Sequence, residues 1–169
     1  MRVAVTGTPG TGKTTATDRL ETCLEVLHLN ELIEDDGLYE AVDADRDSVV
    51  ADLEALEERL AEREDVVIES HLAHHLEADR VAVLRCRPDE LERRLSDRGE
   101  SEEKAAENAE SEALDVILAE AVENHGLESV YEIDTTGREP EAVAADLEAV
   151  IAGEREPSAG EVDFLEFLS

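Results

Sequence analysis

The fold is decided by the stretch Val3-Ala4-Val5-Thr6-Gly7-Thr8-Pro9-Gly10-Thr11-Gly12-Lys13-Thr14-Thr15, in which a short apolar run leads directly into G-x-x-x-x-G-K-T. This is the P-loop pattern, whose glycines let backbone N–H groups point inward at phosphate oxygens. Lys13 would reach the β- and γ-phosphates, and the Thr14 hydroxyl would bind Mg²⁺. The alternative is a glycine-rich turn that matches by chance, which the register of strand, loop and helix start disfavours. The stretch therefore predicts a site for a nucleoside triphosphate.

The composition is dominated by acidic residues. Among 169 residues, 46 are acidic and 15 are basic, for a net charge of −31. Disorder and nucleic-acid mimicry are two readings of such a charge. The third is adaptation to molar salt, where a Debye length of ~3 Å screens self-repulsion. Because apolar periodicity runs through most of the chain and the acid is spread over nearly every helix, we favour the third reading and expect one compact domain.

Charge and cysteine usage also restrict the partners and the compartment. The negative charge argues against direct binding to nucleic acid or to anionic membranes. It makes each arginine informative, since an arginine retained in such a field tends to be paired or to meet phosphate. Cys23 and Cys86 are widely spaced and predict buried free thiols in a reducing compartment. No segment approaches 18 apolar residues, so we expect a soluble, cytoplasmic protein with no membrane partner.

Hydrophobic periodicity predicts alternating strands and helices. The predicted strands are residues 2–6, 25–29, 66–68, 80–86 and 130–133. The predicted helices are residues 13–24, 46–63, 88–97, 101–125 and 140–151, with Leu114, Ile117, Leu118 and Val122 buried. This order predicts an α/β fold with a five-stranded parallel sheet, helices on both faces and nucleotide at the carboxyl ends of the strands. Residues 153–169 are predicted to form an acidic flexible tail, with docking of its apolar residues as the alternative.

The chain length and the lysine positions narrow the class of P-loop protein. A GTPase needs a guanine-reading N-K-x-D or T-K-x-D segment, and the chain has lysines only at positions 13 and 104, neither in such a context. A large remodelling ATPase would need a longer chain. A small P-loop kinase, with a mobile lid over the donor and a separate acceptor region, fits the length best.

Five segments carry a family resemblance: Gly7 to Thr15, Leu38-Tyr39, Val67-Ile68-Glu69-Ser70-His71, Leu91-Glu92-Arg93-Arg94-Leu95-Ser96-Asp97-Arg98-Gly99, and Lys104 to Glu112. Together they resemble adenylate kinase isoenzyme 6, an archaeal and eukaryotic family of nucleoside monophosphate kinases and ATPases of small-ribosomal-subunit maturation. The resemblance covers about residues 1–150. It implies a kinase domain over residues 1–152, with a monophosphate-binding region at about 29–52 and a lid at about 97–107.

The resemblance also implies site residues. Gly10, Gly12, Lys13, Thr14 and Thr15 would hold the phosphates of ATP, with Mg²⁺ on Thr14. Arg98 would meet phosphate from the lid. From the residues themselves, Arg93 and Arg94 are expected to be surface or ion-paired side chains, with a lid contact of Arg94 as the alternative. Glu69 would orient a water of Mg²⁺, His71 would support ATP hydrolysis, and the loop Asp134-Thr135-Thr136 would contact adenine.

Two departures from the family pattern bear on these roles. The family's acid is commonly Asp, and the extra methylene of Glu69 changes its reach. A family arginine ahead of the Leu-Tyr pair is replaced by acidic sequence, with Arg46 as the nearest substitute. His71, His74 and His75 also form H-x-x-H-H, but without a further ligand nearby the sequence favours a catalytic His71 over a structural metal.

The functional prediction is therefore an ATP- and Mg²⁺-dependent kinase acting on AMP or another nucleoside monophosphate, with ATPase activity. As the resemblance implies, it would also take part in 30S subunit and 16S rRNA maturation. Two alternatives stay open: an ATP-driven assembly switch that binds a small-subunit ribosomal protein, and a small-metabolite kinase on the same scaffold.

Overall fold

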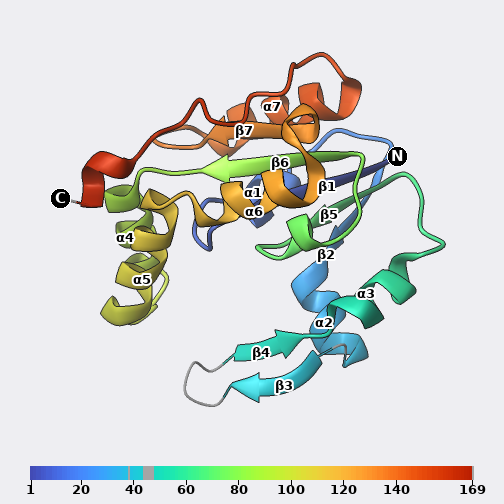
Figure 1. Ribbon diagram of the computed structural model, residues 1–169, viewed down its shortest axis with the longest axis horizontal. Coiled ribbons are helices and arrows are strands. Elements are labelled where there is room, and N and C mark those ends of the chain that lie inside the picture. The colour runs from blue at the N-terminus through green and yellow to red at the C-terminus, as the bar shows by residue number, and fades with distance from the viewer. Residues whose placement is uncertain (38, 44–47, 169) are drawn as a thin grey trace.

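The structure is a computed structural model that describes residues 1–37, 39–43 and 48–168. Its centre is a five-stranded parallel sheet in the order β2-β5-β1-β6-β7, which confirms the predicted fold class (Figure 1). The strands are β1 (Arg2–Gly7), β2 (Glu25–His28), β5 (Val66–Glu69), β6 (Arg80–Arg85) and β7 (Val130–Asp134). Because β1 pairs with β5 on one side and β6 on the other, the loop that follows it leaves the middle of the sheet.

Helices cover both faces of the sheet because strand side chains alternate between two apolar clusters. One face is covered by α2 (Leu29–Asp36), α3 (Leu53–Leu60) and α6 (Val116–His125). The other is covered by α1 (Lys13–Thr17) and α7 (Pro140–Ala152). Strand β1 shows the alternation, since Ala4 belongs to the first cluster and Val3 and Val5 belong to the second.

Two further pairs of elements project from the sheet, one at the lower left and one at the bottom of Figure 1. The first pair is α4 (Pro88–Asp97) and α5 (Glu102–Ala113), and the second is the antiparallel hairpin of β3 (Tyr39–Asp43) and β4 (Ser48–Ala51). Short 3₁₀ turns complete the chain: η1 (Ala73–His75), η2 (Leu127–Ser129) and η3 (Leu165–Leu168). The starts of α4 at Pro88 and of α5 after the N-cap Ser101 are as predicted. Within the described ranges, no helix is long and apolar enough to cross a membrane.

The helix predicted over residues 46–63 is wrong in its first part. Ser48–Ala51 is a strand paired with β3, and the helix begins only at Leu53. Asp52 ends the strand and caps the helix, because its carboxylate accepts a hydrogen bond from the Ala55 amide at 3.0 Å. Adjacent valines suit a strand as well as a helix face, and hairpin pairing decides between them. Arg46 and Leu38 lie outside the described residues.

The two other long helices are shorter than predicted. Helix α1 ends at Thr17, and the helix predicted over 101–125 is broken at Asp115, whose φ is 57°. The Asp115 carboxylate accepts a hydrogen bond from Arg85 at 2.5 Å, which fixes the break. The break turns Leu114 outward, so that it is 50% exposed, while Leu118 is buried as predicted. Cys23 is exposed, which corrects the prediction of two buried thiols.

The segment after α7 lies along β7. The Ser158 amide donates to the carbonyl of Val130 at 3.0 Å, and the carboxylate of Glu132 accepts hydrogen bonds from the amides of Gly160 and Glu161. Phe164 is buried, with the Arg85 guanidinium 5.3 Å from its ring centroid. Of the apolar residues in this segment, Phe164 is therefore docked, whereas Leu165 and Leu168 are exposed.

Candidate active site

The loop between β1 and α1 has the conformation that its glycines require. Gly7 and Gly10 have φ values of 148° and 94°. A Cβ atom at Gly7 would lie 2.6 Å from the Leu84 carbonyl oxygen, and one at Gly10 would lie 2.9 Å from Leu91 and Leu95 side-chain atoms. Only glycine fits these two positions, so the sequence itself fixes the curl of the loop.

Lys13 lies under this loop, and its side chain is buried. Its ammonium donates to the carbonyl oxygens of Gly7 at 2.9 Å and Thr8 at 3.1 Å. Burial lowers the pKa of Lys13 to about 8, with Glu69 opposing and Arg98 adding to the effect. The ammonium is thus held by loop carbonyls and destabilised by its surroundings, an arrangement that favours the approach of an anion.

Thr14 and Glu69 meet at the end of β5. The Thr14 hydroxyl donates to Glu69 Oε1 at 2.7 Å, and Glu69 is buried. Glu69 Oε2 lies 3.4 Å from His28 Nδ1, and His28 Nε2 lies 3.2 Å from Asp18 Oδ1. The longer side chain of Glu69 therefore reaches the hydroxyl directly. A threonine hydroxyl beside a carboxylate is the hard oxygen pair that Mg²⁺ accepts, so these residues fit that ion.

His71 follows β5 and is half-buried. It borders a cavity of about 390 Å³ together with Lys13, Thr14, Glu69 and Arg98. Burial, with further contributions from Lys13, His74 and His75, lowers the pKa of His71 to about 4. The imidazole is therefore neutral near pH 7 and can accept or donate a hydrogen bond in this cavity.

Arg98 lies at the C-cap of α4, where the predicted lid begins. Its side chain is exposed and, among the residues that the structure describes, has no hydrogen bond or ion pair. It borders three cavities: the one with His71, one of about 450 Å³ and one of about 480 Å³. An unpaired guanidinium in a chain with so much acid is available for phosphate.

Arg94, one turn earlier, is in a different position. Its guanidinium donates to the carbonyl of Thr135 at 3.0 Å and to the carbonyls of Gly10 and Thr11, each at 3.4 Å. It also pairs with Glu90 at 3.3 Å. Arg94 thus holds the loop to the end of β7.

The cavity of about 450 Å³ extends from the loop towards α7. Its wall includes Gly12, Thr15, Thr135, Pro140 and Val143. The Thr135 hydroxyl lies within hydrogen-bond distance of two carbonyl oxygens, that of Thr11 at 3.0 Å and that of Arg85 at 2.8 Å, and can donate to either. The loop predicted to contact adenine therefore borders a partly apolar cavity that adjoins the phosphate loop.

Several residues of this site were not identified from the sequence. Asn30 borders the cavity of His71 and accepts a hydrogen bond from the Ser70 hydroxyl at 3.0 Å. Glu112 accepts from the Thr8 hydroxyl at 3.2 Å and from Arg85 Nε at 3.1 Å. The small number of basic residues beside so many acidic ones was a signal for Arg85, whereas the position of Asn30 depends on how α2 leaves β2.

Comparisons with known proteins identify the family. The family model described as "AAA domain" matches residues 3–115. The chain belongs to this family. It is 67% identical to a protein named "Putative adenylate kinase" from Natronomonas pharaonis, over 99% of this chain and 100% of the other. Proteins of the same name from Halobacterium salinarum and Methanosarcina acetivorans are 62% and 49% identical, with 99% and 89% of this chain and 100% and 86% of theirs covered.

Solved structures support the fold. A shikimate kinase from Bacteroides thetaiotaomicron has a TM-score of 0.58 at 18% identity, and covers 90% of this chain and 98% of its own. TT1252 from Thermus thermophilus has a TM-score of 0.51 at 18% identity, over 92% of this chain and 98% of its own. At such identities the likeness concerns the fold alone, which is that of a P-loop kinase.

Proposed function

We propose that the protein is a nucleoside monophosphate kinase that transfers the γ-phosphoryl group of ATP to AMP or a related monophosphate, with Mg²⁺ as its metal. The name of its archaeal relatives supports this proposal. The observation that carries it is the position of Arg98, exposed and without an ion pair among the described residues, where three cavities adjoin the P-loop. A phosphoryl group moving between two nucleotides needs a cation at that junction.

The donor nucleoside is assigned to the cavity between the loop and α7. Pro140 and Val143 offer it an apolar wall, and Thr135 and Arg138 offer polar groups. This combination suits a base and a ribose. The phosphates would then follow the loop amides towards Lys13, as the P-loop pattern predicts.

The acceptor is assigned to the side of α2. Asn30, Glu69 and His71 border the cavity there, and the hairpin β3–β4 lies next to α2 at the bottom of Figure 1. The monophosphate-binding region proposed for residues 29–52 includes this helix and hairpin. Arg46, proposed as the acceptor's cation, lies outside the described residues.

Side chains of this protein would bind the phosphates and stabilise the charge of the transferred group. Lys13 would leave its loop carbonyls for the phosphates, whose charge would restore its ordinary pKa. Thr14 and Glu69 would hold Mg²⁺, which neutralises charge on the phosphates when bound. Arg98 would stabilise the transferred group. No side-chain base is needed, because a monophosphate oxygen is already anionic, and closure over residues 97–107 would exclude water.

ATP hydrolysis is a second candidate activity of the same site. A neutral, half-buried His71 beside Glu69 could accept a hydrogen bond from a water molecule near the γ-phosphate. Water would then be the acceptor whenever the monophosphate is absent. The ribosomal-protein partner and a role in small-subunit maturation stay predictions of the sequence resemblance.

One assay tests the proposal. The protein is incubated with Mg-ATP in molar KCl, with and without AMP, and ADP and free phosphate are both quantified. The kinase proposal predicts AMP-dependent ADP at two equivalents per ATP consumed, with little phosphate. Phosphate release that ignores AMP would favour the ATPase instead. Neither product, from protein shown to be folded by circular dichroism, would refute both.

A further inference from the structure

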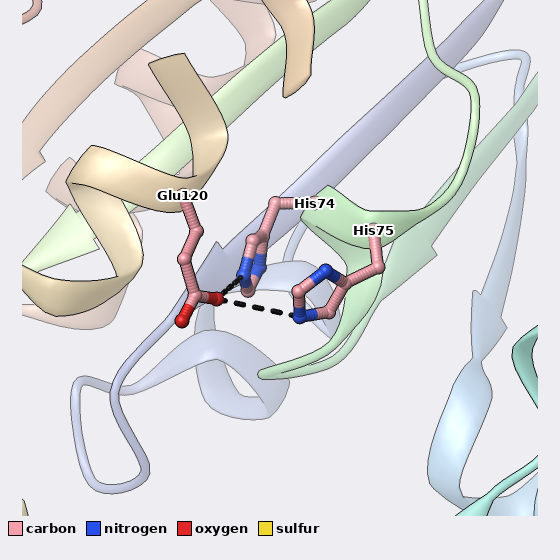
Figure 2. Close-up of side chains that lie close together, drawn as sticks. All are labelled: His74, His75 and Glu120. Atoms are coloured by element: carbon pink, nitrogen blue, oxygen red, sulfur yellow. Dashed lines mark hydrogen bonds and ion pairs between the residues drawn. The ribbon is translucent and has the colours of Figure 1, made fainter. Parts of the chain in front are cut away.

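A second cluster of side chains lies outside the phosphate site (Figure 2). His74 and His75, on η1, point towards Glu120 on α6. Glu120 Oε2 lies 2.7 Å from His74 Nε2 and 3.3 Å from His75 Nε2. One ligand atom from each of the three residues can be chosen so that all lie within 4.8 Å of one another. Both imidazoles thus direct the same ring nitrogen at one carboxylate oxygen.

The surroundings hold His74 in this orientation. It is 1% exposed, and its Nδ1 lies 2.7 Å from the Thr6 hydroxyl of β1. Its backbone carbonyl accepts hydrogen bonds from His125 Nε2 at 2.8 Å and Asn124 Nδ2 at 3.1 Å, which tie η1 to α6. A ring whose second nitrogen is occupied by a hydroxyl presents the first nitrogen in a fixed direction, as ligating histidines do.

We propose that His74, His75 and Glu120 bind one zinc ion. Two imidazole nitrogens and one carboxylate oxygen are a known ligand set for zinc with an open fourth position. Ligand atoms about 2.0–2.2 Å from a tetrahedral ion lie roughly 3.3–3.5 Å from one another. The contact between His75 and Glu120 has this length, and that between His74 and Glu120 would open by several tenths of an ångström.

The types of ligand atom also support the choice of ion. Imidazole ligands favour zinc over Mg²⁺, which takes oxygen ligands. The site is therefore chemically distinct from the oxygen pair of Thr14 and Glu69.

The fourth ligand would come from solvent. All three residues border the cavity of about 480 Å³, which also takes in His71, Arg98 and Lys104. Water would enter the coordination sphere from that cavity. The proposed ion is therefore accessible to added metal in the folded protein, and it can be tested without turnover.

The experiment is a zinc titration of the full chain. Protein stripped with a chelator is dialysed into molar KCl with excess Mg²⁺, which occupies oxygen-rich sites, and zinc is added in competition with a chromophoric chelator. We expect one equivalent of tight binding. With Co²⁺ in place of zinc, we expect the strong visible absorption of four-coordinate cobalt.

The variants His75→Gln and Glu120→Gln are expected to lower zinc affinity by at least about tenfold. Glu123→Gln is the matched control, since Glu123 is exposed on the same helix and borders no part of the cluster. Circular dichroism and thermal unfolding verify that each variant is folded, and the buried His74 is left unchanged. Absence of a saturable equivalent, or equal affinity in Glu120→Gln and Glu123→Gln, would overturn the proposal.

Discussion

The buried ammonium of Lys13 leads to a prediction about stability at alkaline pH. Its pKa is about 8 in the folded chain against 10.5 for an ordinary lysine. Between these values the unfolded chain binds a proton that the folded chain does not, so the free energy of unfolding rises with pH. The difference between the two pKa values corresponds to a gain of about 3 kcal/mol in the free energy of unfolding between pH 8 and 10.5. Lys13→Met lacks this titration, so its stability relative to wild type should fall by that amount between pH 8 and 10.5.

The measurement is urea unfolding of both proteins in molar KCl, followed by circular dichroism from pH 7 to 11. Cys86 titrates in the opposite sense, because burial raises the pKa of its thiol to about 12 from 9.0. Both proteins contain it, so its effect cancels in the difference. Saturating Mg-ATP should flatten the curve for wild type, since bound phosphate restores the charged ammonium. A pH-independent difference without nucleotide would refute the reasoning.

Three other changes have distinct expected outcomes. Arg98→Ala should lower kcat about 10²-fold, measured as ADP formed from Mg-ATP and AMP, and should leave stability unchanged. Arg93→Ala is the control. It removes a cation that pairs with Glu90 on the same helix and should leave kcat near the wild-type value. Arg85→Met should cost about 3–5 kcal/mol in urea unfolding, because Glu112 and Glu132 stay buried without their cation; a loss as small as that of the exposed control Arg63→Met would contradict it. The pKa of His71 is about 4 in the folded chain against 6.5 for an ordinary histidine. The free energy of unfolding of wild type should therefore fall by up to about 3 kcal/mol as the pH is lowered from 6.5 to 4. If His71→Gln lost stability over the same pH range by the same amount, His71 would not be the group responsible.

The sheet and the phosphate loop could be predicted because their signals are local. The run from Val3 to Val5 and the glycines after it encode a buried strand and a turn that no other residue fits. Pro88 and Ser101 mark helix starts in the same way, through a fixed φ and a side-chain cap. Thr14 and Glu69 meet because β1 and β5 are adjacent parallel strands that end at the same edge; the sequence named both residues only through the P-loop pattern and the family resemblance.

The rest depends on contacts between distant segments. Asp115 breaks a helix because Arg85 of β6 binds it, and nothing near Asp115 in the sequence indicates that arginine. Phe164 is buried because Glu132 holds the backbone before it. The partner of His74 and His75 is missing from the pattern H-x-x-H-H, since Glu120 lies on another helix. Such positions are set by packing, which local propensity does not describe.

The central claim is that the loop after β1 holds the phosphates of ATP, and calorimetric titration with Mg-ATP tests it most directly. In molar KCl, wild type should bind one equivalent with a saturable isotherm, and Lys13→Met, shown to be folded, should bind far more weakly. Folded wild-type protein that takes up no Mg-ATP, or a variant that binds it as tightly as wild type, would contradict the account.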